Sequence, residues 1–271
     1  MRAVRQADRG GERRPTLVDP RAVVDESAEL GAGCRVDAYA VIGPGVRLGD
    51  GCRVRAHAVL LGPCDIGPDN DIHSFACIGG APQDLRHRGE PTRLEVRAGN
   101  VFREHVTVSR GTVHGGGTTR IGEGNLLMAY CHVAHDCRLG DRVVMANNAT
   151  LAGHVEVQDC AVFGGMVAVG AFLRIGESTM LAAGSMIERD VPPFCTAAGD
   201  RARLRAVNRV GLDRRGITQA ARAQIKEVFQ ALRAHEPIRE ITARFEARED
   251  TTAEAHRMVR FLAASERGVT R

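Results

Sequence analysis

The stretch from Ile121 to Leu139 reads IGEGNLLMAYCHVAHDCRL, and a large aliphatic residue returns in it at every sixth position. The same spacing of six residues continues on both sides without a slip. The repeated positions of a first run are Val18, Val24, Leu30, Val36, Ile42, Leu48, Val54, Leu60, Ile66, Ile72 and Ile78. Those of a second run are Ile121, Leu127, Val133, Leu139, Met145, Leu151, Val157, Phe163, Val169, Ile175, Leu181 and Ile187. A short run of Val96, Phe102 and Val108 lies between them.

A strict period of six fits neither an α-helix, with 3.6 residues per turn, nor an amphipathic strand, with a period of two. It is typical of short parallel strands joined by tight turns, each strand pointing one large residue inward. Three such strands close a triangular coil of 18 residues, and successive coils stack about 4.8 Å apart. The pattern therefore predicts an all-β parallel β-helix of hexapeptide repeats over residues 16–195.

Two stretches leave the period, near residues 79–95 and 109–120, and we interpret both as excursion loops. The second contains Gly115-Gly116-Gly117, which we expect to be a flexible loop rather than a phosphate cradle, because no nucleotide-binding motif surrounds it. The repeat stops at Val191-Pro192-Pro193. Helical periodicity runs from Thr218 to Gly268, with further helices expected from Glu240 and Thr252, and it predicts a small C-terminal helical domain over residues 196–271. Residues 1–15 predict a disordered arginine-rich arm.

The composition supports a repetitive core of small aliphatic side chains, since aromatic residues make up only 4% and tryptophan is absent. Eight cysteines without a Cys-x-x-Cys pair predict buried free thiols in a reducing cytoplasm. There is no apolar run of 18 residues and no secretory signal pattern, so we expect no stable membrane insertion. The net charge of +4 is mild; we expect no nucleic-acid partner, although a basic face could attract an acidic protein.

The repeat also brings together residues that could carry chemistry. His135 and Asp136 follow the repeated Val133 by two and three residues, and Gly153 and His154 occupy the same positions 18 residues later. One coil above the other, they would offer a general base, an orienting carboxylate and a backbone N–H for an oxyanion. Residues adjacent in a strand point to opposite faces, so a bond from Asp136 to His135 requires a corner of the coil.

Two other interpretations of these histidines remain open. Histidines at turn corners can be merely solvated, and a cluster with His132 could instead bind zinc, as in the γ-class carbonic anhydrases on this kind of scaffold. The spacing His132-Val-Ala-His135 does not match the spacing expected for that class. We therefore expect no metal and no cofactor.

Several motifs resemble one family of enzymes, and they extend from about Val18 through the C-terminal helical segment. They are Gln83-Asp84-Leu85, Gly89-Glu-Pro-Thr-Arg93, Arg110-Gly-Thr112, Asn125-Leu-Leu-Met128, His132-Val-Ala-His135-Asp136-Cys137, Ala146 to His154, Asp190-Val-Pro-Pro193 and Arg214-Arg-Gly216. The family is that of the acyl-[acyl-carrier-protein]–UDP-N-acetylglucosamine O-acyltransferases, which begin lipid A synthesis. The resemblance implies a left-handed coil and a cytoplasmic homotrimer. It also implies acyl carrier protein and UDP-N-acetylglucosamine as partners.

The resemblance also assigns roles. It makes His135 the general base, Asp136 its orienting partner and the Gly153 N–H the oxyanion donor. The substrate-binding residues it implies are Gln83, Asp84, His132, His154, Asn208, Arg214 and Arg215. Met180 and Ala183 would line the acyl-chain groove.

This chain departs from the family pattern at Gly170 and Ala171, where the family has histidine and glutamine, and at Arg86, Ser109 and Val210. The set of His135, Asp136 and Gly153 is intact, so acyl transfer is the expected chemistry. One alternative is a divergent paralogue that acylates another UDP-sugar on oxygen or nitrogen. Another is a non-catalytic β-helix that serves as a binding module.

Overall fold

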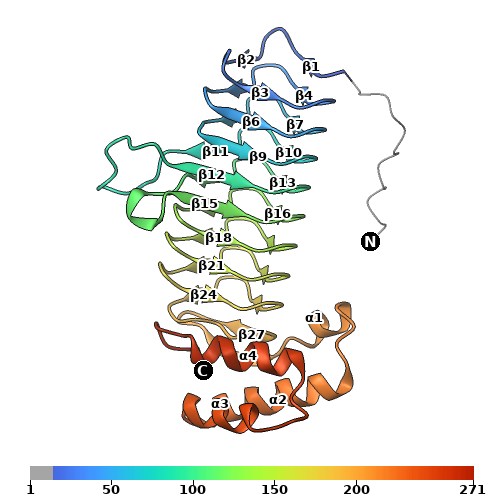
Figure 1. Cartoon of the computed structure of the whole chain (residues 1–271), viewed down its shortest axis with the longest axis vertical. Helices are drawn as coiled ribbons and strands as arrows, with labels where there is room; N and C mark the ends of the chain where they lie inside the picture. The colour runs from blue at the N-terminus through green and yellow to red at the C-terminus, as the bar shows by residue number, and fades with distance from the viewer. Residues whose placement is uncertain (1–14) are drawn as a thin grey trace.

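The computed structural model describes residues 15–271, which form an elongated stack of triangular coils with helices at one end (Figure 1). Three parallel sheets make the sides of the prism. Along most of the prism each strand pairs with the strand 18 residues later, as Leu17 does with Arg35 and His132 with Thr150. Where the excursion loops are inserted, the offset is longer, as in the pairs of Asp71 with Val101 and of Val101 with Leu126. The predicted coil and its register are therefore confirmed, and the fold is a left-handed parallel β-helix followed by helices.

The strands are short because each contributes only one side of a coil. The first sheet contains β1 (Leu17–Val18), β4 (Arg35–Val36), β7 (Arg53–Val54), β10 (Asp71–Ile72), β13 (Val101–Phe102), β16 (Leu126–Leu127), β19 (Val144–Met145), β22 (Val162–Phe163), β25 (Met180–Leu181), β27 (Cys195–Ala198) and β28 (Arg203–Val207). The second contains β2 (Val23–Val24), β5 (Val41–Ile42), β8 (Val59–Leu60), β11 (Cys77–Gly80), β14 (Thr107–Ser109), β17 (His132–Val133), β20 (Thr150–Leu151), β23 (Ala168–Val169) and β26 (Met186–Ile187). The third contains β3 (Glu29–Leu30), β6 (Val46–Leu48), β9 (Cys64–Ile66), β12 (Arg93–Val96), β15 (Thr118–Ile121), β18 (Arg138–Leu139), β21 (Glu156–Val157) and β24 (Arg174–Ile175).

The repeated aliphatic residues point into the prism and are buried from Val36 onward, with Phe102 and Phe163 filling the wider layers. All eight cysteines are free and six of them are buried, as predicted. Burial raises the pKa of the six buried thiols, to about 12 for Cys52 and Cys137, so these side chains serve as core residues and not as nucleophiles.

The two excursion loops are shorter than predicted because the flanking strands continue into them. The first spans residues 81–92, between β11 and β12, and the second spans residues 110–117, between β14 and β15. A single 3₁₀ turn, η1 (Val113–Gly115), occupies the second loop, which is thus ordered rather than flexible. Both loops project from the same side of the prism (Figure 1).

The C-terminal segment begins with two strands that the helical periodicity did not predict. β27 and β28 form an antiparallel pair on the first sheet, and helices begin only at Arg209. They are α1 (Arg209–Arg214), α2 (Gln219–Arg233), α3 (Ile238–Glu246) and α4 (Ala253–Ala263). No helix within residues 15–271 has the length and apolar character needed to cross a bilayer. The predicted arm of residues 1–15 lies almost entirely outside the described residues.

The outward residues of the three sheets differ in chemistry. On the third sheet they are charged: Glu29, Arg47, Asp65, Glu95, Arg120, Arg138, Glu156 and Arg174. On the second they are mostly apolar or uncharged: Val23, Val41, Val59, Cys77, Thr107, His132, Thr150, Ala168 and Met186. On the lower part of the first sheet they are apolar: Val101, Leu126, Val144, Val162 and Met180. The upper strands of the first sheet instead point Arg35, Arg53 and Asp71 outward. We call the third sheet the charged face, and we call the second sheet and the lower part of the first sheet the apolar faces.

The edge where the first sheet passes to the second carries a column of five stacked rings, which we call the aromatic column. Its rings are Tyr39, His57, Phe75, His105 and Tyr130, one per coil, with adjacent centroids 4.7–5.1 Å apart and nearly parallel planes. All five residues have a left-handed φ. Tyr39, Phe75 and Tyr130 are about half exposed, although large aromatic side chains usually bury most of their surface.

Candidate active site

The candidate site lies at the edge where the second sheet passes to the third. His135 and Asp136 follow β17, and Gly153 and His154 follow β20 in the next coil. The backbone N–H of His154 donates to the carbonyl of His135 at 3.0 Å, which fixes the two coils in the predicted register. Asp136 has a φ of 61°, so the chain turns there and both side chains can meet. This is the corner that the sequence argument required.

His135 and Asp136 form a close pair, with Nδ1 of the imidazole 2.8 Å from Oδ2 of the carboxylate. The Asp136 side chain is almost completely buried, whereas that of His135 is 13% exposed. Nε2 of His135 has no hydrogen-bond partner among residues 15–271. A buried carboxylate on one ring nitrogen and a free second nitrogen is the arrangement of an oriented general base.

Gly153 lies directly beneath the His135 ring. A Cβ added at Gly153 would be 2.5 Å from Cε1 and 2.8 Å from Nε2 of His135. The backbone N–H of Gly153 has no acceptor within the described part of the chain. An unpaired N–H beside the free nitrogen of the base is where an oxyanion donor would be needed.

His132 and His154 flank the pair. His154 stacks on Phe172 with centroids 4.3 Å apart, and its Nε2 is 3.6 Å from Oδ2 of Asp136. Nδ1 of His132 is 2.7 Å from the hydroxyl oxygen of Thr107. Burial lowers the pKa of both imidazoles, and the charge of His135 lowers it further. Both are therefore neutral hydrogen-bonding groups at neutral pH.

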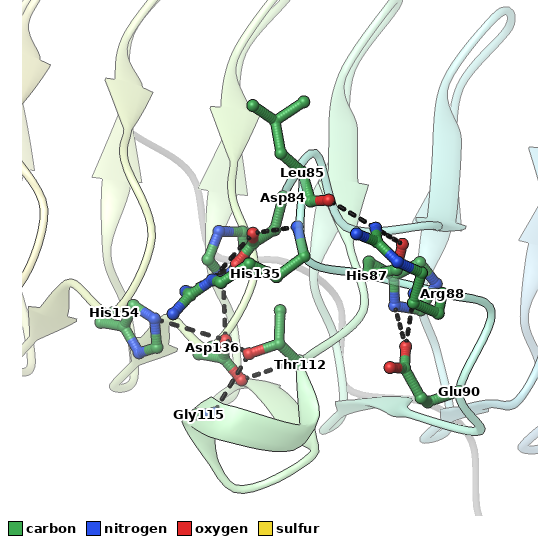
Figure 2. A network of polar contacts seen from close by, with 11 residues as sticks. Asp84, Leu85, His87, Arg88, Glu90, Thr112, Gly115, His135, Asp136 and His154 are labelled. Atoms are coloured by element: carbon green, nitrogen blue, oxygen red, sulfur yellow. Dashed lines mark hydrogen bonds and ion pairs between the residues drawn. The ribbon is translucent and has the colours of Figure 1, made fainter.

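The loop of residues 81–92 covers the site from one side (Figure 2). Asp84 accepts hydrogen bonds from the Arg86 guanidinium at 2.8 and 3.2 Å, and this pair, with the Arg86 backbone N–H, holds the pKa of Asp84 well below its usual range. Figure 2 shows Asp84 beside His135, so the carboxylate lies near the base. Gln83 is exposed next to Asp84, and Leu85 at the loop tip is 96% exposed.

The remaining predicted site residues lie elsewhere in this chain. Asn208 caps α1 and donates to the Ser178 carbonyl at 2.8 Å, while Arg215 donates to Glu177 at 2.6 Å. Both contacts are on the edge where the third sheet passes to the first, and Arg214 is exposed nearby on α1. Met180 is on the first sheet, and Ala183 is exposed at its edge with the second. A single chain does not bring these five residues to His135.

The positions that depart from the family pattern have separate surroundings. A Cβ at Gly170 would come 3.3 Å from the Ile187 carbonyl oxygen, so the neighbouring backbone would need to give only slightly. Ala171 is exposed, and Ser109 is buried at the end of β14. Val210 is 60% exposed on α1, which is a surface that a partner or substrate could cover.

A metal ion was the competing interpretation of the histidine cluster. The ligand atoms of His135, Asp136 and His154 lie within 4.8 Å of one another, and His132 is not part of that group. The Asp136 oxygens already accept hydrogen bonds from Thr112 and face His135 at 2.8 Å. A cation there would have to displace this network, so the geometry favours the base.

Two residues that the sequence argument did not assign to the site support Asp136 from the second loop. Thr112 donates its backbone N–H to Oδ1 at 2.8 Å and its hydroxyl to Oδ2 at 2.7 Å. Gly115 packs so closely that a Cβ there would be 2.0 Å from Cγ of Asp136. Figure 2 shows Asp136 between these residues and His135. The signal in the sequence is the run Gly115-Gly116-Gly117, which predicts flexibility but here allows this close approach.

Comparison with known proteins identifies the relatives of this chain. The family described as Udp N-acetylglucosamine O-acyltransferase, domain 2, matches residues 190–270, and the six-repeat bacterial transferase hexapeptide family matches residues 27–62 and 118–153. An acyl-[acyl-carrier-protein]–UDP-N-acetylglucosamine O-acyltransferase from Alkalilimnicola ehrlichii is 47% identical over 261 residues, covering 94% of this chain and 100% of that protein. A protein of the same name from Herminiimonas arsenicoxydans is 45% identical over 260 residues, covering 94% and 97%.

Solved structures are similar over the same length. LpxA from Acinetobacter baumannii superposes with a TM-score of 0.92 at 33% identity, covering 94% of this chain and 100% of that one. LpxA from Bacteroides fragilis, a UDP-N-acetylglucosamine acyltransferase, gives 0.91 at 30% identity with the same coverage. The hexapeptide coil and the relatives that match it along its length define the class of the protein as an acyltransferase. The chain belongs to the family of acyl-[acyl-carrier-protein]–UDP-N-acetylglucosamine O-acyltransferases.

Proposed function

We propose that the protein transfers a 3-hydroxyacyl group from acyl carrier protein to the 3-hydroxyl of UDP-N-acetylglucosamine, the first step of lipid A biosynthesis, in the cytoplasm. The observation that carries the chemistry is the arrangement of His135 between the buried Asp136 and the free N–H of Gly153. Family membership supports the choice of donor and acceptor.

In the proposed reaction, Nε2 of His135 takes the proton of the sugar hydroxyl while the hydroxyl oxygen attacks the thioester carbonyl carbon. Asp136 holds the imidazole through Nδ1 and stabilises the imidazolium that forms. The carbonyl oxygen gains negative charge and is stabilised by the Gly153 N–H. When the C–S bond breaks, the leaving thiolate takes the proton from His135, and no cofactor is needed.

Residues around the base would bind the nucleotide sugar. Asp84 lies near the base and would accept hydrogen bonds from the sugar, with Gln83 beside it. His132 and His154, neutral because burial lowers their pKa, would line the pocket of the nucleotide sugar. Arg86 already neutralises Asp84, so the sugar would share the carboxylate with this guanidinium.

A homotrimer would complete the site, and the chemistry of the faces supports it. A solvated face should resemble the charged face, where the cross-strand pairs Arg47–Asp65 and Arg120–Glu95 are 2.5 and 3.0 Å long. The apolar faces instead expose aliphatic side chains on two adjacent sides of the prism, with the aromatic column between them. Large exposed apolar surfaces mark interaction sites. Copies of this chain would cover them if the second sheet of one packed on the first sheet of the next.

This packing has a consequence for the site. Suppose that the edge with the aromatic column faces the threefold axis in every copy. The edge of the second sheet that lies away from the axis in one copy then meets the edge of the first sheet that lies away from the axis in the next copy. The edge with His135 would then face the neighbour's edge with Asn208, Arg214 and Arg215. Asn208 and Arg215 would contact the uridine diphosphate part, and Arg214 would contact the carrier protein or a phosphate. Met180 and Ala183 of the neighbour would bound an acyl groove along the apolar seam.

A basic groove supports the proposed carrier-protein partner. A cavity of about 770 Å³ between β28, α1 and α2 is lined by Arg205, Arg209, Arg222 and Lys226 over an apolar floor that includes Phe229. Such a groove is complementary to an acidic protein with exposed apolar residues. The decisive test is a mass-spectrometric assay with UDP-N-acetylglucosamine and carrier proteins that bear several acyl lengths.

Acylated UDP-N-acetylglucosamine is the expected product, and it should disappear in the His135→Ala variant. Absence of product with every carrier protein would overturn this substrate assignment. It would favour transfer to another UDP-sugar, on oxygen or nitrogen, for which the replaced positions Gly170 and Ala171 are the motivating observation.

A further inference from the structure

Thr112 contacts the catalytic pair from a loop 24 residues away in sequence. Its side chain is buried, and it begins the 3₁₀ turn η1, where its hydroxyl oxygen accepts a hydrogen bond from the Gly115 N–H at 3.1 Å. The same residue donates to both oxygens of Asp136, by its N–H at 2.8 Å and its hydroxyl at 2.7 Å. Thr112 thereby holds both carboxylate oxygens of Asp136.

The donor and acceptor types of these groups fix the direction of each hydrogen bond. Because the Thr112 hydroxyl oxygen accepts from Gly115, its own proton is directed to Oδ2 of Asp136. The N–H of Thr112 can only donate, so Oδ1 must accept. Both carboxylate oxygens therefore accept hydrogen bonds, which favours the ionised form of Asp136. The short contact from Oδ2 to His135 then requires the proton to be on Nδ1 of the imidazole.

We propose that Thr112 is a positioning residue that acts through Asp136 to keep the proton of neutral His135 on Nδ1, so that Nε2 carries the lone pair that accepts the substrate proton. This inference rests on the proposed function, because it assigns a purpose to Nε2 of His135. Gly115 serves the same purpose, because any side chain there would collide with Asp136. The second excursion loop is thus the support of the base.

Removing the hydroxyl should change both the rate and its pH dependence. Oδ2 of Asp136 would lose one donor, and Nε2 of His154, 3.6 Å away, could then compete with His135 for this oxygen. The negative charge left on Oδ2 would stabilise the imidazolium of His135, which moves the acid limb of the pH–rate profile to higher pH. The other charged or titratable groups facing His135 are His132, His154 and Asp84, with Arg86 beyond them, and all are unchanged in this variant.

The experiment compares Thr112→Val with Thr112→Ser, which keeps the hydroxyl, and with Thr92→Val as a matched control. Thr92 is also buried in the excursion-loop layer, but its hydroxyl has no partner among residues 15–271. We expect Thr112→Val to lose about 10- to 100-fold in kcat, the scale of one hydrogen bond to a charged group, with little change in KM. Its acid limb should move upward, while Thr112→Ser and Thr92→Val should retain the wild-type profile.

Melting curves of the same proteins, and a parallel Thr112→Ala variant, separate positioning from packing. A wild-type profile in both hydroxyl-free variants would overturn the inference, as would an equal loss in Thr112→Ser or a rate loss that only follows a lowered Tm. Nitrogen-15 spectra of histidine-labelled protein give a readout without turnover, and a protonated Nε2 on neutral His135 would also overturn it. Activity retained in His135→Ala would instead refute the proposed base itself.

Discussion

The imidazole of His135 rests on the backbone of Gly153 in the next coil, with Cε1 only 2.5 Å from where a Cβ at Gly153 would be. A methyl group there must push the ring away from both Asp136 and the Gly153 N–H. We therefore expect Gly153→Ala to lose at least about 100-fold in kcat, in the range contributed by a positioned base. Stability should fall by about 1–3 kcal/mol, as in other overpacked sites.

Steady-state kinetics and thermal unfolding check this prediction, with Gly43→Ala as the control. Gly43 follows β5 on the same edge, far from the site, and its added Cβ would come no closer than 3.2 Å to the Leu60 carbonyl oxygen. If Gly153→Ala kept wild-type kcat, the contact between the ring and this backbone would have no role in the reaction.

His135→Ala removes the base without filling or opening the core, because the imidazole lies at the edge of the prism. We expect acyl transfer to fall by about 10²- to 10⁴-fold. The melting temperature and the sedimentation coefficient should be unchanged, and product formation by mass spectrometry measures the loss. Elemental analysis of the purified wild-type protein would reveal bound zinc, which would favour the metal interpretation of this cluster.

Acid should destabilise the fold partly through His132. Burial lowers the pKa of His132 from its usual value of 6.5, so at pH below 6.5 the unfolded chain binds a proton that the folded chain refuses. The free energy of unfolding therefore decreases as the pH falls through 6.5. We expect His132→Asn to show a shallower fall in Tm between about pH 7.5 and 5.5 than the wild type. Identical slopes in calorimetry would contradict this assignment.

The aromatic column provides a test of assembly. Phe75→Asp places a charge in the middle of the stack, between His57 and His105, where we expect copies of the chain to meet. Analytical ultracentrifugation should show a shift from trimer towards monomer in this variant. Glu29→Lys, an exposed charge reversal on the charged face, should leave the trimer intact. A trimer that tolerates Phe75→Asp would place the interface elsewhere.

Glu177 joins the prism to the helices, because its buried carboxylate accepts from Arg215 at 2.6 Å and also pairs with Arg257 of α4. Glu177→Gln leaves two guanidinium groups with a neutral partner. We expect a loss of about 1–3 kcal/mol in the free energy of unfolding, measured by denaturant titration. Arg257→Gln, which leaves one ion pair in place, should cost less.

The coil was predictable because its rule is local: one large residue at every sixth position suffices to set strands, corners and register. His135, Asp136, Gly153 and His154 followed from the same rule, since stacked positions differ by one coil. The support from Thr112 and Gly115 was not predictable, because it comes from a loop outside the period and crosses 24 residues. A run of glycines there indicates close approach as readily as flexibility.

The C-terminal segment shows the opposite limit. Helical periodicity predicts α2, α3 and α4, but the strands β27 and β28 and the short α1 carry too few residues for a periodic signal. Asn208 and Arg215 were expected near the base from resemblance alone. In this chain they lie on another edge of the prism, because spacing within one chain cannot report on contacts between chains.

The antiparallel strand β28 has one further consequence. All the remaining strands of the first sheet run parallel to their neighbours, and each presents the same edge to the next coil. β28 reverses direction against β27, and the chain turns into helices that lie across this end of the prism (Figure 1). A parallel coil from another molecule would find no matching edge here. The enzyme thus carries at this end its own terminator against end-to-end polymerisation into fibrils.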